Sequence, residues 1–170
     1  MRENLRWQPV ASLILCLLGL GIATYLTVTH FDKVALVCSG NGTINCEKVT
    51  TSPQSEIFGI PVAMLGLAFF VPMLLLCLPA AWRSTDRRIH LARLVWSVVG
   101  LGTIVYLIVT ELFVIKAICL WCSGVHLITF LLFVLTVTTA PVVLAPEKGF
   151  APDQAGLDTP SRLEQPVAEA

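Results

Sequence analysis

Four long apolar stretches constrain this chain more than any other feature of its sequence. They run over residues 9–31, 60–81, 92–115 and 119–143. Each has the length of about 20 residues that an α-helix needs to cross ~30 Å of hydrocarbon. Hydrophobic residues make up 56% of the chain and charged residues 13%, which is typical of an integral membrane protein. We therefore expect an all-α, multi-pass membrane protein built as a bundle of four transmembrane helices.

The basic residues predict how this bundle is oriented. If the N-terminus is cytoplasmic, most Lys and Arg residues fall on the cytoplasmic side, and only Lys33, Lys48 and Lys116 fall outside. By the positive-inside rule, both termini are expected in the cytoplasm, with the loop of residues 32–59 and the turn before Cys119 on the opposite side. The formal net charge is zero, and we expect no nucleic-acid partner.

The chain divides into a membrane domain and a tail. Residues 1–145 contain the four apolar stretches and their connections, and we expect them to form one catalytic domain. Residues 146–170 are rich in Pro, Ala, Asp, Glu and Gln, with almost no aromatic residues. Such a composition buries too little apolar surface to fold, so the sequence predicts a disordered cytoplasmic tail.

Two pairs of cysteines fall on the same side of the membrane. Cys119 and Cys122 form a Cys-Leu-Trp-Cys motif at the start of the fourth apolar stretch, and Cys38 and Cys46 lie in the loop of residues 32–59. Disulfides form and persist in extracytoplasmic compartments. The N-terminus of a helix also favours a thiolate, which is the reactive form of cysteine. The two pairs therefore suggest an electron relay between dithiols at a membrane surface.

The pattern alone leaves other interpretations of the cysteines open. A zinc site would need more thiolate or imidazole ligands, and the wide spacing of Cys38 and Cys46 differs from the usual zinc knuckle, so we expect no metal. Structural disulfides in a non-catalytic assembly or binding protein are the main alternative. A transporter or channel is disfavoured because no apolar stretch carries an ordered series of polar residues. Cys16 and Cys77 lie within apolar stretches, where a free cysteine is typically a small buried apolar residue.

The order of these motifs resembles that of the vitamin K epoxide reductases and their bacterial homologues. The order is Cys38 and Cys46, then Ser52, then Ile57-Phe58-Gly59, then Cys119-x-x-Cys122. In DsbB-type proteins, which do similar chemistry, the Cys-x-x-Cys motif precedes the spaced pair. The resemblance covers about residues 9–143. It implies a four-helix bundle around a quinone and a thiol:quinone oxidoreductase activity in the bacterial cytoplasmic membrane.

The resemblance also implies a role for each cysteine. Cys122 would face the quinone, Cys119 would be its partner and exchange with Cys46, and Cys38 would react with an external thiol protein. Bacterial members commonly carry a thioredoxin-like domain fused after the bundle, which this sequence does not show. The expected partner is therefore a separate, secreted thioredoxin-fold protein of the DsbA kind. Thiolate attack passes the disulfide between the pairs, and the membrane quinone pool (menaquinone, ubiquinone or phylloquinone) accepts the electrons.

Three residues are expected to contact the quinone. His126 lies four residues after Cys122, hence on the same face of a helix, and replaces the tyrosine of the vertebrate enzyme. Ser55 takes the place of an asparagine that contacts the quinone in the vertebrate enzymes. Phe58 belongs to the motif that precedes the second apolar stretch.

Other polar residues near the outer ends of the apolar stretches have weaker assignments. Glu111 is an ionisable residue within the third stretch, which makes it a candidate for the redox site. It could equally reach interfacial water or Lys116. Tyr25 and His30, near the end of the first stretch, are expected to be interfacial anchors.

Overall fold

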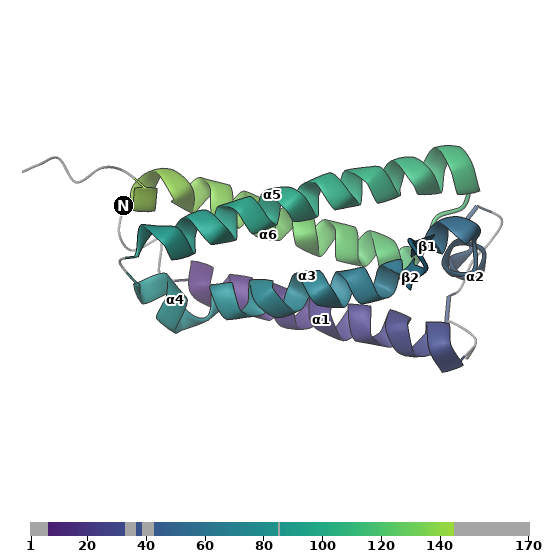
Figure 1. The fold of residues 1–170 in the computed structure, drawn as a ribbon, viewed down its shortest axis with the longest axis horizontal. Helices are drawn as coiled ribbons and strands as arrows, with labels where there is room; N and C mark the ends of the chain where they lie inside the picture. The colour runs from purple at the N-terminus through teal and green to yellow at the C-terminus, as the bar shows by residue number, and fades with distance from the viewer. Residues whose placement is uncertain (1–6, 33–36, 39–42, 85, 145–170) are drawn as a thin grey trace, which may run out of the picture.

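The computed structural model describes residues 7–32, 37–38, 43–84 and 86–144, and the protein is mostly helical (Figure 1). The principal helices are α1 (Gln8–Asp32), α3 (Val62–Cys77), α5 (Arg87–Val109) and α6 (Leu120–Leu144). α1 packs against α3 and α6, and α5 packs against the same two helices, which closes the bundle. The helical bundle expected from the sequence is thus present. The expected disordered tail, residues 146–170, lies outside the described residues.

Glycines allow close packing between these helices. Gly19 of α1 lies against the ring of Phe70, and Gly100 of α5 lies against the ring of Phe69, with no room for a methyl group at either glycine. Both phenylalanines belong to α3. Small residues of this kind let helices approach each other in a membrane, where association depends on close packing. The two glycines therefore set the spacing of α1 and α5 from α3.

Among the described residues, three helices are long and apolar enough to cross a membrane. They are Gln8–Asp32, the continuous segment Arg87–Ile115, and Leu120–Ala140. Many large apolar side chains on them are exposed, including Leu18, Val99 and Leu127. Exposed apolar surface of this extent suits contact with lipid.

The prediction of one continuous helix over residues 60–81 is wrong. Strand β2 (Ile60–Pro61) precedes α3, and a break at Leu78 separates α3 from the short helix α4 (Pro79–Arg83). The backbone of Leu78 is extended, with ψ at 144°, because the residue before a proline is disfavoured in the helical conformation. α3 by itself has 16 residues and is about 24 Å long, shorter than the ~30 Å hydrocarbon layer.

The third long helix, α5, continues as a π-helix before the turn into α6. α5 begins at Arg87, five residues before the predicted start at residue 92, because Asp86 caps the helix by accepting a hydrogen bond from the N–H of Arg88 (2.9 Å). The helix continues as the π-helix η3 (Thr110–Ile115). It ends where Lys116 adopts a left-handed backbone conformation, with φ at 52°.

The loop between α1 and α3 is built from short elements. They are α2 (Cys46–Thr50), the 3₁₀ turn η2 (Pro53–Ser55), and a hairpin of strands β1 (Glu56–Ile57) and β2. Phe58 and Gly59 close the hairpin with φ values of 55° and 78°, as a two-residue turn with two left-handed residues requires. These elements lie at the end of the bundle opposite α4 (Figure 1).

Candidate active site

The four cysteines outside the bundle core lie together at one end of the molecule. Cys38 and Cys46 form a disulfide with a Cα–Cα distance of 6.1 Å, and Cys119 and Cys122 are free thiols. Cys46 and Cys119 are almost completely buried in one cluster, and Cys38 and Cys122 pack against it. The structure thus brings together two pairs that are more than 70 residues apart in the sequence.

Backbone hydrogen bonds hold the two pairs in register. Ile44 and Ile118 form a parallel β-bridge. The N–H of Asn45 donates to the carbonyl of Ile118 (3.1 Å), and the N–H of Ile118 donates to the carbonyl of Thr43 (3.0 Å). The bridge residue Ile44 lies two residues before Cys46, and Ile118 lies one residue before Cys119. The main chain therefore holds these two cysteines next to each other.

Cys119 occupies the N-cap position of α6. Its carbonyl accepts a hydrogen bond from the N–H of Ser123 (2.9 Å), and its Sγ accepts one from the N–H of Cys122 (3.2 Å). A hydrogen bond from the Cys122 thiol lowers the pKa of Cys119, and the backbone N–H groups of Cys122 and Trp121 lower it further, whereas burial and the charge of Glu111 oppose them. Cys119 therefore has the surroundings of a reactive thiolate.

A polar clasp holds Cys38 near this helix start. We use the term Val37 clasp for Tyr25, Val37 and Trp121. The indole N–H of Trp121 donates to the carbonyl of Val37 (3.0 Å), and the N–H of Val37 donates to the hydroxyl of Tyr25 (3.2 Å). The rings of Tyr25 and Trp121 pack 5.0 Å apart. From the sequence, Tyr25 was expected only to anchor the helix at the membrane surface, and Trp121 within the Cys-Leu-Trp-Cys motif was the one available signal of the clasp.

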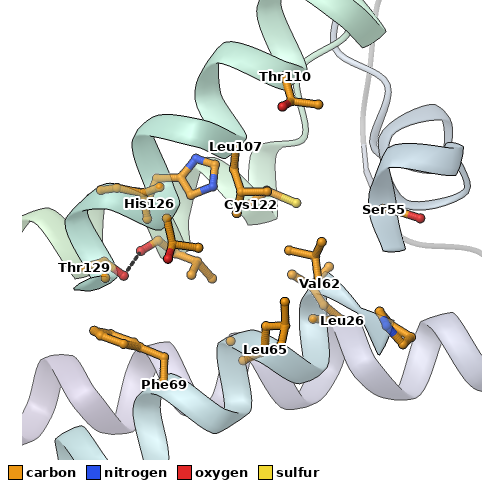
Figure 2. Close-up of a pocket in the computed structure, with 18 of the residues that line it drawn as sticks. Leu26, Ser55, Val62, Leu65, Phe69, Leu107, Thr110, Cys122, His126 and Thr129 are labelled. Carbon is orange, nitrogen blue, oxygen red and sulfur yellow. Dashed lines mark hydrogen bonds between the residues drawn. The ribbon is translucent and has the colours of Figure 1, made fainter. Parts of the chain in front are cut away.

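An apolar cavity of about 360 Å³ lies inside the bundle beside the cysteines. All four principal helices and the loop elements contribute to its wall. Figure 2 shows Cys122 at this space, with His126 further along the same helix and Ser55 on the facing loop. Cys122 is the one cysteine of the cluster that lines the cavity, among the residues described. Of the two pairs, the pair on α6 is therefore the one that can reach a ligand in the bundle.

The predicted quinone contacts His126 and Ser55 both line the cavity but differ in their hydrogen bonding. His126 is buried at the cavity wall, and within the described parts of the chain its imidazole makes no hydrogen bond. Ser55 also lines the cavity, but its hydroxyl donates to the carbonyl of Ser52 (2.7 Å). Its proton is therefore already engaged, whereas the imidazole of His126 is available to a ligand.

Phe58 is not brought to the cavity. It is fully exposed and is not among the cavity-lining residues. The physical reason is its place at the tip of the β1–β2 hairpin, where the left-handed backbone directs the side chain away from the bundle. In this structure, the predicted contact between Phe58 and a quinone has no geometric basis.

Glu111, for which the sequence left both a redox role and an interfacial role open, is a cavity residue. It is only 7% exposed and lines the cavity from the π-helix η3. Its carboxyl group lies beside the backbone N–H of Cys119 and the thiol of Cys122. The sequence showed an ionisable residue within an apolar stretch, but it could not show that the residue faces the cysteines.

A comparison with known protein families agrees with this arrangement. The model of the Vitamin K epoxide reductase family matches residues 10–137, which is most of the chain and includes both cysteine pairs. Members of this family are membrane proteins that carry out thiol–disulfide oxidoreduction and in general use quinones. With its apolar helices and clustered cysteines, this chain is an integral membrane protein that belongs to the vitamin K epoxide reductase family.

Proposed function

We propose that the protein is a thiol:quinone oxidoreductase that reoxidises a secreted thioredoxin-fold protein of the DsbA kind and so supports disulfide formation. The observation that carries the proposal is the contact of both cysteine pairs in one cluster, with Cys122 opening onto an apolar cavity. Exchange requires a thiolate close to a disulfide, and a quinone requires an apolar pocket with a few polar groups. The site offers both requirements within one end of the bundle.

The external partner would react with the loop pair. A thiolate of the partner attacks Cys38 and displaces Cys46 as a thiolate, which takes up a proton. The second thiol of the partner then loses its proton and displaces Cys38, so the partner leaves as a disulfide and the loop pair as a dithiol. Two electrons thus pass from the partner to Cys38 and Cys46.

The loop pair would next reduce the pair on α6. The Cys46 thiolate attacks Cys119 of a Cys119–Cys122 disulfide and releases Cys122 as a thiolate. Cys38 then attacks Cys46, which restores the loop disulfide and leaves Cys119 and Cys122 reduced. In this state the loop pair is a disulfide and the pair at the start of α6 carries two free thiols. This state is therefore the one from which electrons would leave for the quinone.

The cavity suits a quinone as the electron acceptor. Its volume of about 360 Å³ falls within the range of small-molecule sites, and its wall is mainly apolar. A bound quinone would supply an acceptor for two electrons and two protons. As Cys119 and Cys122 join in a disulfide, both electrons leave from this pair. The imidazole of His126 would donate a hydrogen bond to a quinone oxygen, a ring feature that menaquinone, ubiquinone and phylloquinone share.

We also propose that four helical segments cross the membrane, with α3 and α4 together forming the second crossing. Arg83, Arg87 and Arg88 lie at the α4 end of the bundle, opposite the cysteine cluster (Figure 1). Under the positive-inside rule this end is cytoplasmic. Both termini would then be cytoplasmic, and both cysteine pairs would face the oxidising side, where a secreted partner can reach them.

The proposal is tested by coupling thiol oxidation to quinone reduction in the purified protein in lipid nanodiscs. Reduced DsbA-type protein and ubiquinone or menaquinone are added, and disulfide and quinol are measured together. We expect one quinol for each disulfide formed. A Cys16→Ala variant is the matched control because this buried cysteine lies outside the cluster. If no quinone changes the thiol content of the wild-type protein, the alternative of structural disulfides in a non-catalytic protein is supported instead.

A further inference from the structure

Glu111 lies where the backbone of the third helix departs from regular α-helix. It is the second residue of the π-helix η3, a rare conformation that is frequent at functional sites. Its carbonyl accepts hydrogen bonds from the N–H groups of Lys116 and Ala117, the second at 3.3 Å. These bonds close the wide turn and hold the Glu111 backbone in place. The side chain lines the cavity, and the residue is only 7% exposed.

The neighbours of this carboxyl group are the reacting cysteines. It lies beside the backbone N–H of Cys119 and the thiol of Cys122. Other titratable side chains that line the cavity are His30 from α1 and His126 from α6, whereas α2 and α3 contribute no titratable group to its wall within the described residues. An ionisable residue within a membrane helix is costly and is commonly retained for proton transfer.

We propose that Glu111 is a catalytic residue that carries the proton of Cys122 to the quinone. This inference rests on the proposed function, because it requires a quinone in the cavity. The carboxyl group and the Cys122 thiol line the same cavity, so Glu111 can connect the donor of the proton with its acceptor. His126, by contrast, lies one helical turn beyond Cys122 and would serve as a hydrogen-bond donor.

The step balances in electrons and protons. The Glu111 carboxylate takes the proton of Cys122, and Cys119 has lost its own proton to solvent. The bond between Sγ of Cys119 and Sγ of Cys122 forms, and two electrons leave this pair for the quinone. One proton then passes from Glu111 to a quinone oxygen, and solvent supplies the second proton. Glu111 returns to the carboxylate, and the products are one disulfide and one quinol.

The test separates proton transfer from thiol exchange. Fully reduced wild-type, Glu111→Gln and Glu111→Asp proteins are mixed with excess soluble ubiquinone, and quinol formation is followed in one turnover in H₂O and D₂O. General acid–base groups contribute about 10²–10⁴-fold, so we expect Glu111→Gln to reduce this rate at least ~100-fold. Glu111→Asp keeps a carboxyl group and should retain an intermediate rate. Glu47→Gln, an exposed carboxylate of α2 outside the cavity, is the matched control.

A second measurement in the same variants is the exchange of the oxidised loop pair with a reduced thioredoxin-fold protein, which should stay within about twofold of wild type. Equal quinol rates in wild-type and Glu111→Gln protein would overturn the inference, as would an equal loss in both half-reactions, which would indicate a structural role. The wild-type protein decides the separate question of the proposed function. If it fails to reduce the quinone at all, the proposed function fails before Glu111 is considered.

Discussion

The bundle contains two pairs of neighbouring free thiols, Cys16 with Cys77 and Cys119 with Cys122, and their surroundings differ. The thiols of Cys16 and Cys77 lie side by side, fully buried in the core with Phe70 and Met73, and neither lines the cavity. The pair on α6 lies at a helix start, contacts a second cysteine pair and opens through Cys122 onto the cavity. Proximity of two thiols is therefore common to both pairs. The proposed redox site differs by its access to a second cysteine pair and to the cavity.

The largest expected effect is the difference between these two pairs. Cys122→Ala should abolish quinone-coupled thiol oxidation because no disulfide can form on α6, whereas Cys77→Ala should keep nearly wild-type activity. Activity per folded molecule is measured in nanodiscs with the same partner and quinone. Loss of activity in well-folded Cys77→Ala protein would show that the core pair takes part in the relay.

Removing both outer members of the relay should trap its intermediate. In the Cys38→Ala, Cys122→Ala double variant, we expect a Cys46–Cys119 disulfide, since the β-bridge between Ile44 and Ile118 holds these residues together. Peptide mass mapping under non-reducing conditions detects the bond. The Cys46→Ala, Cys122→Ala double variant is the companion. A larger yield of the Cys38–Cys119 disulfide in this variant than of the Cys46–Cys119 disulfide in the first would reverse the roles assigned to the loop cysteines.

Substitution of His126 should have the next largest effect, and this effect should be confined to the reaction with the quinone. Its imidazole would donate a hydrogen bond to the quinone oxygen as negative charge develops there. Hydrogen bonds to charged groups contribute about 1.5–3 kcal/mol, which corresponds to roughly 10–100-fold in rate or affinity. We expect His126→Ala to raise KM for the quinone or lower kcat by such a factor, with exchange between Cys46 and Cys119 unchanged. His126→Tyr should retain more activity, and wild-type kinetics of His126→Ala would assign the residue to packing.

A substitution of Arg93 should affect the stability of the protein at the opposite end of the bundle, without affecting activity. Its buried guanidinium donates two hydrogen bonds to the carbonyl of Leu76 (2.6 and 3.0 Å) and lies 3.9 Å from the ring centroid of Trp82. Arg93→Met would leave this carbonyl without these donors near the break that ends α3. We expect a loss of about 1.5–3 kcal/mol in stability, seen as a lower Tm, with unchanged activity per folded molecule. Arg88→Met, which alters an exposed side chain, is the control.

The smallest expected effect concerns the Val37 clasp. Trp121→Phe removes the indole N–H that bonds to the Val37 carbonyl but keeps a ring against Tyr25. A neutral hydrogen bond contributes about 0.5–1.5 kcal/mol, so we expect exchange between the loop pair and the α6 pair to slow by roughly 2–10-fold. Stopped-flow thiol measurements follow this step. Tyr25→Phe should give a similar change, and an unaltered rate in both variants would show that the clasp does not position Cys38.

Several features followed directly from local sequence. The Cys-Leu-Trp-Cys motif lies at the start of α6 because an apolar stretch follows it, and the third apolar stretch ends at Ile115 as expected. The break at Leu78 was missed, although Pro79 offered a local signal, because the hydropathy of residues 60–81 is continuous. The outward direction of Phe58 was also missed, since it depends on the hairpin turn and not on the apolar character of the side chain.

By itself, the sequence determined that the protein is helical, embedded in a membrane and equipped with two cysteine pairs, because hydropathy and residue spacing are properties of the local chain. Only the tertiary structure decided which groups meet. The contact of Cys46 with the Cys119 region depends on a β-bridge between distant segments. The place of Glu111 beside Cys122 depends on a π-helical turn. Such contacts arise from backbone hydrogen bonds and packing between elements, which no window of neighbouring residues contains.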